Sequence, residues 1–534
     1  MNFVMPEVKL PTFEDKSFNI TDFGAVGDGI FLNTEAINKT IEACTNAGGG
    51  KVVIPFGMWL TGPIELKSNV NLHLEYGAVL SFSKDINLYP LIHSNYEGFP
   101  TIRATSPINA NAAENIAITG NGVVEGNGEI WRPVKKWKVT EKQWNAITSS
   151  GGVITNPESS NALWFPSEAA AQGRDYDKEH GNKCTDLEEC EKYKHFFRPV
   201  LVSLVDCKQV LLEGVTFQNS GAWCLHPRLC ENLTIQNIKV RNPWYSANGD
   251  GLDIESCRYV KVYNSVFDVG DDAICIKSGK NEDGRLLGRP TEYVDIQKCT
   301  VYHGHGGFVI GSEMSGGARN ILVKDCVFLG TDVGLRFKSC LGRGGVVENI
   351  YCDNINMANI ANESIVITTG YGIHNSKKGQ QVEPEEVPEF KNINMKNINC
   401  VGAGRAIGID GLNEMPIKNI TVENISEQVT KIGNEIIQFM SFGGMCATLS
   451  AKANHTYNSF GNPSPKTIFQ RLCEESDPIG CVTFEYADGS TEQLYVPDDM
   501  FQQFDMDEFG NLEFFIGYSE EDDENCCCCG DCEE

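Results

Sequence analysis

The chain has 534 residues, of which 41% are hydrophobic and 22% are charged, an ordinary mixture for a folded protein. The net charge of −28 argues against nucleic acid as a partner, because a protein that binds a polyanion generally needs a basic face. No apolar run approaches the roughly 18 residues of a membrane-spanning helix, so we expect no membrane partner. The first residues lack the pattern of a secretory signal, so we expect a cytoplasmic location, with secretion as the alternative.

The first predicted element is a helix near the start of the chain. Apolar residues recur at helical spacing between Ala36 and Cys44, and the glycines Gly48–Gly50 then end the pattern. A repeat fold needs its open end covered. We therefore predict that this helix caps one end of the molecule and that the first strand follows it.

A short repeated unit organises the middle of the chain. Each copy has a polar residue, often asparagine, then alternating aliphatic and polar residues, then asparagine or cysteine. This alternation is the period of a strand, and most neighbouring copies begin 23 to 34 residues apart. Leucine-rich repeats would need a leucine ladder, and a β-propeller would need about 40 residues per blade. We predict an all-β fold, a right-handed parallel β-helix, with asparagines stacked at its corners.

Two stretches interrupt this repeat within a predicted solenoid of residues 1–441. The segment 128–198 is rich in Trp, Lys and Glu and is too long for an ordinary loop, so we expect it to shape a cleft. Residues 442–534 form a predicted small appendage of unknown function. Within it, Val482–Pro497 reads as a hairpin with Asp-Gly at its turn, and an acidic tail carries Cys526–Cys529 and Cys532. Many of the other cysteines lie in strand-like segments, which predicts buried free thiols, and among them no CxxC pair has a second such pair or spaced histidines, so a structural zinc site is not expected.

Four polar motifs fall on successive repeats: Asn248–Asp253, Gly270–Ala273, Gly304–Gly306 and Arg336–Lys338. Taken singly, each motif is usually a turn or a solvated surface. Together, in this order and about one coil apart, they are hard to explain by chance. Basic residues beside the insertion, such as Arg132 and Arg198, are expected to be mainly solvated.

Geometry explains why these motifs favour a chemical site. Stacked coils lie about 4.8 Å apart, so Asp250, Asp271 and Asp272 can line one wall. Mutual repulsion raises the pKa of at least one carboxyl, which supplies a general acid and a general base, as glycoside hydrolysis requires. A carboxyl separation of roughly 6.5–9.5 Å would give inversion. One coil further His305 can tune the proton balance, and the cations of the next coil can bind a sugar carboxylate.

These motifs resemble those of the polygalacturonase family of pectin hydrolases, and the likeness runs from Phe23 to about Glu423. The resemblance implies hydrolysis of α-1,4-linked galacturonan, without cofactor or metal. It implies that Asp271 is the general acid, that Asp250 and Asp272 activate water, and that His305 supports them. It further implies that the sugar is bound by Arg336, Lys338, Asn248 and His226. The family usually has threonine where this chain has Gly249.

The same resemblance separates related activities. The Arg-x-Lys motif favours homogalacturonan over rhamnogalacturonan. The insertion, with Trp223–Pro227 and Gly311–Ser315, looks like the exo-acting branch, which implies release of galacturonic acid from a chain end. The alternatives are an endo-acting enzyme, a rhamnogalacturonan-type hydrolase, a calcium-dependent pectate lyase and a β-helix that only binds carbohydrate. The sequence does not determine the oligomeric state.

Overall fold

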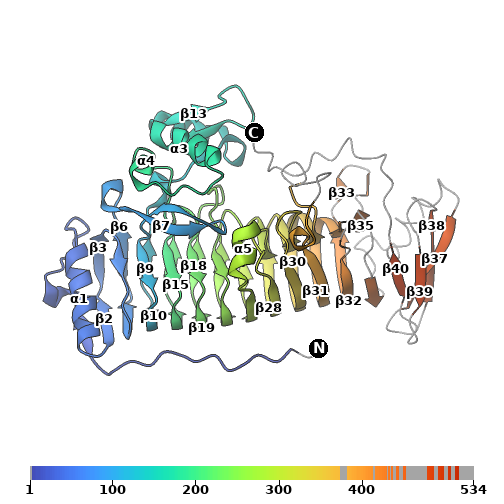
Figure 1. Ribbon diagram of the computed structural model, residues 1–534, viewed down its shortest axis with the longest axis horizontal. Helices are drawn as coiled ribbons and strands as arrows, with labels where there is room; N and C mark the ends of the chain where they lie inside the picture. Colours follow the sequence, from blue (N-terminus) through green and yellow to red (C-terminus); the bar gives the residue numbers. More distant parts are fainter. Residues whose placement is uncertain are drawn as a thin grey trace.

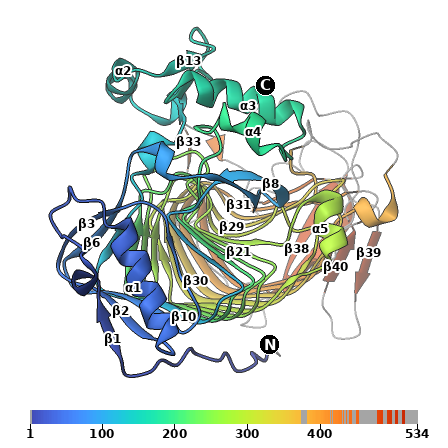
Figure 2. The ribbon, with the colours of Figure 1, turned by 60° about the vertical axis from the view of Figure 1, so that its left-hand side comes forward.

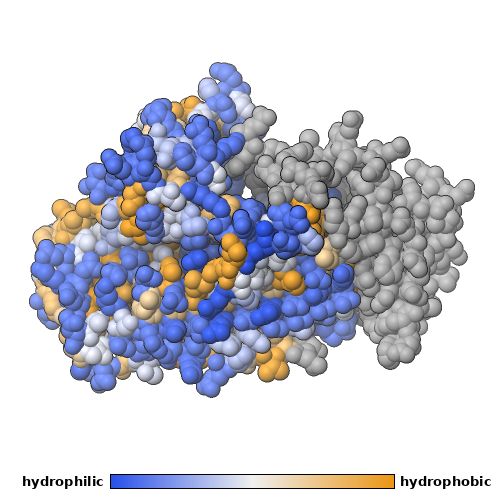
Figure 3. Space-filling view, viewed as in Figure 1, coloured by the Kyte–Doolittle hydropathy of each residue, from blue (hydrophilic) through white to orange (hydrophobic). Residues whose placement is uncertain are grey.

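The computed structural model is an elongated right-handed parallel β-helix with a separate subdomain above one face (Figure 1). It describes residues 3–372, 382–412, 415 and 417–429, and beyond them short strands between 431 and 515; side chains are described as far as residue 426. Hydrophilic residues cover most of the described surface in the view of Figure 3. No described helix is long and apolar enough to cross a membrane.

The strands stack into three parallel columns, because each coil pairs in register with the next. The first column holds β4 (Ile64–Glu65), β9 (Ile108–Asn111), β15 (Val202–Val205), β18 (Leu225–Arg228), β21 (Leu252–Glu255), β24 (Ile274–Lys277), β27 (Gly306–Ile310) and β29 (Val333–Lys338). It continues into the second halves of β30 (Val346–Thr368) and β31 (Glu389–Asp410), and then into β35 (Met440–Gly443).

The other two columns close the coil. The second column holds β1 (Ser17–Asn19), β2 (Gly50–Ile54), β5 (Val70–Leu74), β10 (Glu114–Gly120), β16 (Lys208–Glu213), β19 (Glu231–Gln236), β22 (Arg258–Tyr263), β25 (Thr291–Gln297), β28 (Ala318–Leu329), the first halves of β30 and β31, β32 (Lys418–Val429) and β36 (Leu449–Lys452). The third holds β3 (Gly57–Thr61), β6 (Ala78–Phe82), β11 (Val123–Glu125), β17 (Thr216–Gln218), β20 (Lys239–Arg241), β23 (Val266–Asp268) and β26 (Thr300–Val301).

The alternation of the repeat explains this architecture. One side chain in two points into the coil, and these residues form a single continuous core that includes Ile254, Ile276 and Phe337, all fully buried. The cap is α1 (Thr34–Asn46), which buries Ala36, Ile37, Ile41 and Cys44 against the first coils (Figure 2). Both the solenoid and its capping helix are confirmed.

Asparagines mark the corners of the coils, as predicted. Asn320, Asn349, Asn392 and Asn419 all have left-handed backbone, with φ between 53° and 57°. Their side chains join consecutive coils: Asn349 donates to Asn320, Asn392 to Asn349, and Asn419 to Asn392, at 3.3, 3.3 and 3.0 Å. Asparagine suits this position because it tolerates left-handed backbone and carries both a donor and an acceptor.

The segment without repeats folds into the subdomain above the first column (Figures 1 and 2). A small antiparallel sheet of β12 (Val134–Lys135), β14 (Leu163–Phe165) and β13 (Val153–Thr155) packs with α2 (Glu141–Ser149), α3 (Glu168–Glu179) and α4 (Leu187–Glu191). The hairpin β7 (Leu91–Tyr96) and β8 (Phe99–Ala104) lies between it and the solenoid, and α5 (Asn281–Leu287) follows β24.

The last part of the chain is described only as short strands. The predicted hairpin is confirmed, since β37 (Pro478–Glu485) pairs antiparallel with β38 (Thr491–Pro497). The other strands are β33 (Lys431–Ile432), β34 (Glu435–Ile436), β39 (Gln503–Met506) and β40 (Leu512–Phe515). Parallel pairing reaches β36, past the boundary predicted after residue 441, and that boundary stays a prediction. Cys526–Cys529 and Cys532 lie outside the described residues.

Candidate active site

Three aspartates meet at the start of two neighbouring strands of the first column. Asp250 precedes β21, and Asp271 with Asp272 precedes β24 on the next coil. One oxygen from each carboxyl lies within 4.8 Å of the others. Asp250 and Asp272 are buried, whereas Asp271 is half-buried and is the most accessible of the three. We call these residues the carboxylate triad.

Asp272 is held in its ionised form by two cations of β29. The Lys338 ammonium lies 3.0 Å from Asp272 Oδ2, and Arg336 Nη1 lies 3.8 Å from Oδ1. Burial alone would raise the pKa of Asp272, but Lys338 and Arg336 outweigh that effect and hold it well below its usual value. Sequence reasoning placed these cations where a sugar carboxylate could bind; in the structure, both also neutralise a member of the triad.

Asp250 has the opposite environment. It is 3% exposed, its Oδ1 has no hydrogen-bond partner among the described residues, and burial raises its pKa well above the usual value, with further contributions from Asp253 and Asp271. The triad therefore combines an ionised carboxylate with a carboxyl that favours its proton. Because the three groups lie so close, this proton belongs to the triad as a whole. The assignment of Asp271 as acid and Asp250 as base stays a prediction.

His305 stands at the edge of the triad, at the start of β27. Its backbone N–H donates to the Asp271 carbonyl at 2.9 Å, and its Nδ1 lies 2.7 Å from Asp332 Oδ2. Burial alone would raise the pKa of Asp332, but the bond to His305 and the charges of His305, Lys138 and Arg336 lower it. Sequence reasoning missed Asp332, although it stands at the equivalent place one coil later, directly before β29.

Asn248 is positioned by the insertion. Arg198 donates to Asn248 Oδ1 at 2.7 Å and to the Ala247 carbonyl at 2.9 Å. Local packing explains why position 249 is a glycine, because a Cβ at this position would lie 1.8 Å from Ser246 Oγ. Ser246 in turn donates to the Pro243 carbonyl at 2.6 Å. The loop is therefore packed too tightly for the threonine that the family usually has.

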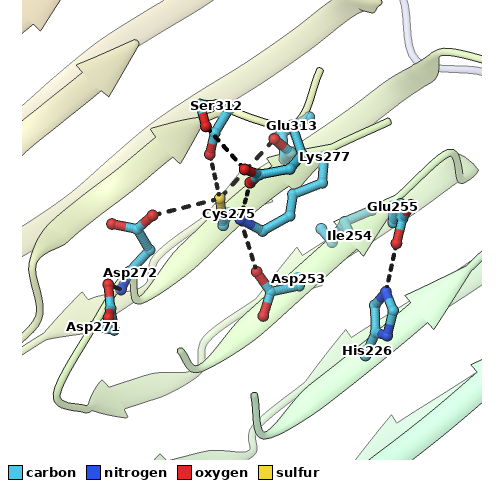
Figure 4. Close-up of polar contacts among 12 residues, drawn as sticks. His226, Asp253, Ile254, Glu255, Asp271, Asp272, Cys275, Lys277, Ser312 and Glu313 are labelled. Atoms are coloured by element: carbon cyan, nitrogen blue, oxygen red, sulfur yellow. Dashed lines mark hydrogen bonds and ion pairs between the residues drawn. The ribbon is translucent and has the colours of Figure 1, made fainter. Parts of the chain in front are cut away.

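His226 lies apart from the triad. Its Nε2 is 2.7 Å from Glu255 Oε2, both side chains are buried, and Figure 4 shows this pair beyond Asp253 as seen from Asp271 and Asp272. Burial alone would raise the pKa of Glu255, but His226, Arg228 and Lys277 lower it. The Trp223 ring packs edge-on against His226 at 5.0 Å. This geometry gives no support for a contact between His226 and substrate, and that role stays a prediction.

A second charged group, to which sequence reasoning gave no role, lies beside the triad on the neighbouring strands (Figure 4). Lys277 Nζ is 3.1 Å from Glu313 Oε2 and 3.7 Å from Asp253 Oδ1, and all three side chains are largely buried (Figure 4). Beside them Cys275 Sγ approaches Asp272 Oδ2 at 3.8 Å. Burial raises the pKa of Asp253 well above its usual value. We call Asp253, Lys277 and Glu313 the buried ion cluster. The alternation along β24 could have indicated that Lys277 belongs to the outer face, because Cys275 and Lys277 face outward whereas Ile274 and Ile276 face inward.

Two basic residues beside the insertion correct an expectation. Arg132 and Arg198 are 2% and 8% exposed, so they are not solvated. Arg132 donates to the Ser220 carbonyl and, at 2.7 Å, to Asn219 Oδ1. Both guanidinium groups hold main-chain carbonyls of neighbouring coils, which is a structural use of an always-charged, multiply donating side chain.

The triad has the ligand types of a cation site, but the charged groups around it disfavour a bound cation. Three carboxylate oxygens within 4.8 Å suit Mg²⁺ or Ca²⁺ in kind. However, Lys338 and Arg336 already neutralise Asp272, and burial favours a proton on Asp250. The charge that would attract a divalent ion is therefore largely compensated.

Comparison with known proteins decides the family. Residues 168–441, more than half of the chain, match the model described as "Glycosyl hydrolases family 28", and residues 17–143 match "Rhamnogalacturonase A/epimerase, pectate lyase-like". The chain belongs to glycosyl hydrolase family 28. It is therefore a glycoside hydrolase, and the carboxylate triad is the candidate catalytic site of this family 28 enzyme.

Similar proteins agree with this membership. The chain is 28% identical to "Probable polygalacturonase" of Vitis vinifera over 77% of this chain and 74% of that protein. It is 29% identical to "Exo-poly-alpha-D-galacturonosidase" of Dickeya chrysanthemi over 74% of this chain, and spans 64% of that protein's length. The solved structure of a hyperthermoactive exopolygalacturonase from Thermotoga maritima is 32% identical, covers 83% of this chain and 92% of its own, and gives a TM-score of 0.68.

Proposed function

We propose that this family 28 enzyme hydrolyses α-1,4-galacturonosyl linkages in polygalacturonate or oligogalacturonides and releases galacturonic acid from a chain end. The observation that carries the proposal is the divided carboxylate triad, with the pKa of Asp272 lowered and that of Asp250 raised within 4.8 Å. An acid and a base side by side are what glycoside hydrolysis needs.

The reaction needs one proton donor and one activated water. The proton that the triad shares, assigned in this step to Asp271, passes to the glycosidic oxygen as the bond to the anomeric carbon breaks. A water held by Asp250 and Asp272 attacks that carbon and loses its proton to a carboxylate. A water that donates two hydrogen bonds of about 2.8 Å bridges oxygens about 4.5 Å apart, so a span of up to 4.8 Å accommodates it.

The stereochemical outcome is proposed to be inversion. The nearest triad oxygens are closer than the roughly 6.5–9.5 Å expected between the carboxyl groups of inverting enzymes. Inversion is nevertheless consistent with a water on the opposite side of the sugar from the acid. Proton NMR of the first product formed distinguishes the two outcomes, because inversion releases the β-anomer from an α-linkage, and early α-anomer would contradict it.

The substrate is proposed from charge. Lys338 and Arg336 are the cations nearest the triad, and a Lys ammonium or Arg guanidinium has several donors, so contact with Asp272 does not exhaust them. A galacturonate carboxylate beside the scissile linkage matches them in charge. The relatives from Vitis vinifera, Dickeya chrysanthemi and Thermotoga maritima are named for action on polygalacturonate, which supports the same substrate here.

The exo mode is supported by the subdomain above the first column and by the two relatives named as exo-acting. The test is incubation with polygalacturonate, without added calcium, followed by separation of products by size. Galacturonic acid alone from the outset is expected. A ladder of oligomers would indicate an endo enzyme, and unsaturated, ultraviolet-absorbing products would indicate a lyase. No product would move the proposal to another pectin or to binding alone.

A further inference from the structure

An exposed tryptophan on the insertion has no structural explanation. All seven tryptophans of the chain are described, and five of them are buried or nearly so. The two exposed ones are Trp137, at 52%, and Trp244, at 48%. A solvent-facing indole ring forgoes the burial that normally stabilises it. Trp137 is therefore a candidate for contact with a ligand.

The position of Trp137 relates it to the carboxylate triad. Its neighbour Lys138 donates from Nζ to the Gly270 carbonyl at 3.2 Å, and Gly270 directly precedes Asp271. The Lys138 charge also reaches the partner of His305, since it contributes to the lowered pKa of Asp332. Trp244 stands six residues before Asp250, on the loop that leads into the triad. Both exposed tryptophans therefore lie on segments that touch or carry the site.

The segment that presents Trp137 is firmly held. Lys136–Lys138 form a single 3-10 turn after β12, and the Lys136 backbone N–H donates to the Ala162 carbonyl at 2.9 Å. Below it, Val134, Trp144, Ala162 and Trp164 form a small core, against which Tyr245 packs from the triad loop. The ring is thus presented on a fixed platform and loses little freedom when it binds a partner.

The charge of this segment is unusual for the protein. The chain carries a net charge of −28, yet three of the four residues from Lys135 to Lys138 are lysines. The ammonium groups of Lys135 and Lys138 lie 5.8 and 5.4 Å from the centre of the Trp137 ring. An aromatic ring with cations over it matches a ligand that has both an apolar face and an anionic group, such as a sugar ring that carries a carboxylate.

We propose that Trp137 and Lys138 form a subsite that binds a galacturonate residue of the chain next to the residues at the triad. Trp137 packs on the C–H face of the sugar ring, and Lys138 pairs with its carboxylate while keeping its bond to Gly270. This subsite rests on the proposed function, because its ligand is the galacturonan substrate. It gives the insertion a role in holding the polymer, in addition to its place above the first column.

Binding of trigalacturonate to the full-length inactive variant Asp271→Asn, measured by calorimetry, tests the subsite. Adding Trp137→Ala or Lys138→Met is expected to weaken binding about ten-fold each. Lys138→Arg keeps the charge and is expected to bind within about two-fold of the parent, as is Lys142→Ala, an exposed lysine of α2 on the same insertion. The loss from Lys138→Met should shrink at high salt, and that from Trp137→Ala should not.

The outcomes separate this subsite from the proposed function. Equal affinity in the parent, Trp137→Ala and Lys138→Met would overturn the subsite, even if the wild type hydrolyses polygalacturonate. No binding of trigalacturonate to the parent would overturn the subsite and the proposed substrate together. Retained binding that depends on Trp137, in a protein that releases no galacturonic acid, would support the subsite and contradict the hydrolysis.

Discussion

Along β21, β24, β27 and β29 the inner and outer faces of the first column are both buried, and they are built on different principles. On β21, Leu252 and Ile254 point inward and are fully buried, while Asp253 and Glu255 point outward and are 0% and 1% exposed. The inner face is buried by the coil itself. The outer face is covered by neighbouring charged side chains, such as Lys277 beside Asp253, and by the loop with Glu313, which pairs with Lys277. Alternation along a strand thus shows which side chains share a face of the sheet. Only the tertiary structure shows whether that face is exposed to solvent.

The energetic consequences of the two faces are opposite. Burying an aliphatic side chain stabilises the fold by roughly 1.5–3 kcal/mol. Burying a charged side chain destabilises the fold unless a partner compensates the charge. Neither carboxylate oxygen of Asp253 has a hydrogen-bond partner among the described residues. We therefore expect inward substitutions to reduce stability and outward ones to reduce activity.

The largest expected effect is on the outer face. Asp271→Asn should lower kcat about a thousand-fold, because it removes the assigned proton donor. Its melting temperature and its affinity for trigalacturonate should stay near those of the wild type, since Asp271 is half-buried. Steady-state kinetics and thermal unfolding check this. Full activity in the variant would refute the role of Asp271.

The inner face offers a matched substitution within the Arg336–Lys338 motif. Phe337 is fully buried in the core between the two outward cations, so Phe337→Ala should cost about 3–5 kcal/mol of unfolding free energy. Denaturant unfolding measures the loss, with Phe337→Leu as the milder control. Well below the melting temperature, kcat should change far less than in Asp271→Asn. A stable but inactive Phe337→Ala protein would contradict the division between the faces.

A third substitution tests the charge balance of the triad. In the wild type, the lowered pKa of Asp272 contributes stability that is present above the pKa of the unfolded chain and is lost as the pH falls toward the folded value. Lys338→Met removes the nearest cation, so the pKa of Asp272 rises.

The acid limb of the pH profile of kcat/KM should therefore move to higher pH. The stability that ionised Asp272 contributes should likewise be lost at a higher pH than in the wild type. The KM should also rise, because a substrate contact is lost. Lys324→Met, which removes a more exposed cation paired with Asp353, is the control. An acid limb unchanged by Lys338→Met would show that Lys338 does not set the ionisation of Asp272.

The smallest expected effect is that of metal removal. Lys338 and Arg336 compensate the charge of Asp272, so EDTA should leave the rate of galacturonic acid release within about two-fold, and added Ca²⁺ should not raise it. Activity measured after dialysis against the chelator checks this. Loss of activity that Ca²⁺ restores would favour the lyase alternative.

Residue patterns in the sequence were sufficient to predict the features that depend on the backbone. The alternation predicted the solenoid, the asparagines its corners, and the spacing of the motifs brought Asp250 and Asp272 onto adjacent coils. The pattern could not show that Lys338 contacts Asp272, because an outward lysine can equally point to solvent. It could show that Lys277 faces outward, but not that Lys277 pairs with Glu313, because that pairing depends on how a loop folds back.

The insertion was the least predictable part. Its length indicated a function, but its basic residues were expected to be solvated. Arg132 and Arg198 are instead buried because main-chain carbonyls of neighbouring coils lie within their reach, which no local pattern encodes. The tight contact between Gly249 and Ser246 is likewise a property of the folded loop.

The strand register has a consequence for how such an enzyme can diversify. Main-chain pairing fixes the rise from one coil to the next, whatever the length of the connection between columns; one connection carries α5 and another the whole subdomain. Strand pairing thereby keeps the groups at the strand starts in register when a connection changes in length. A loop grafted from a relative should redirect the enzyme to a different polymer while the three aspartates of the triad keep their places on the adjacent coils.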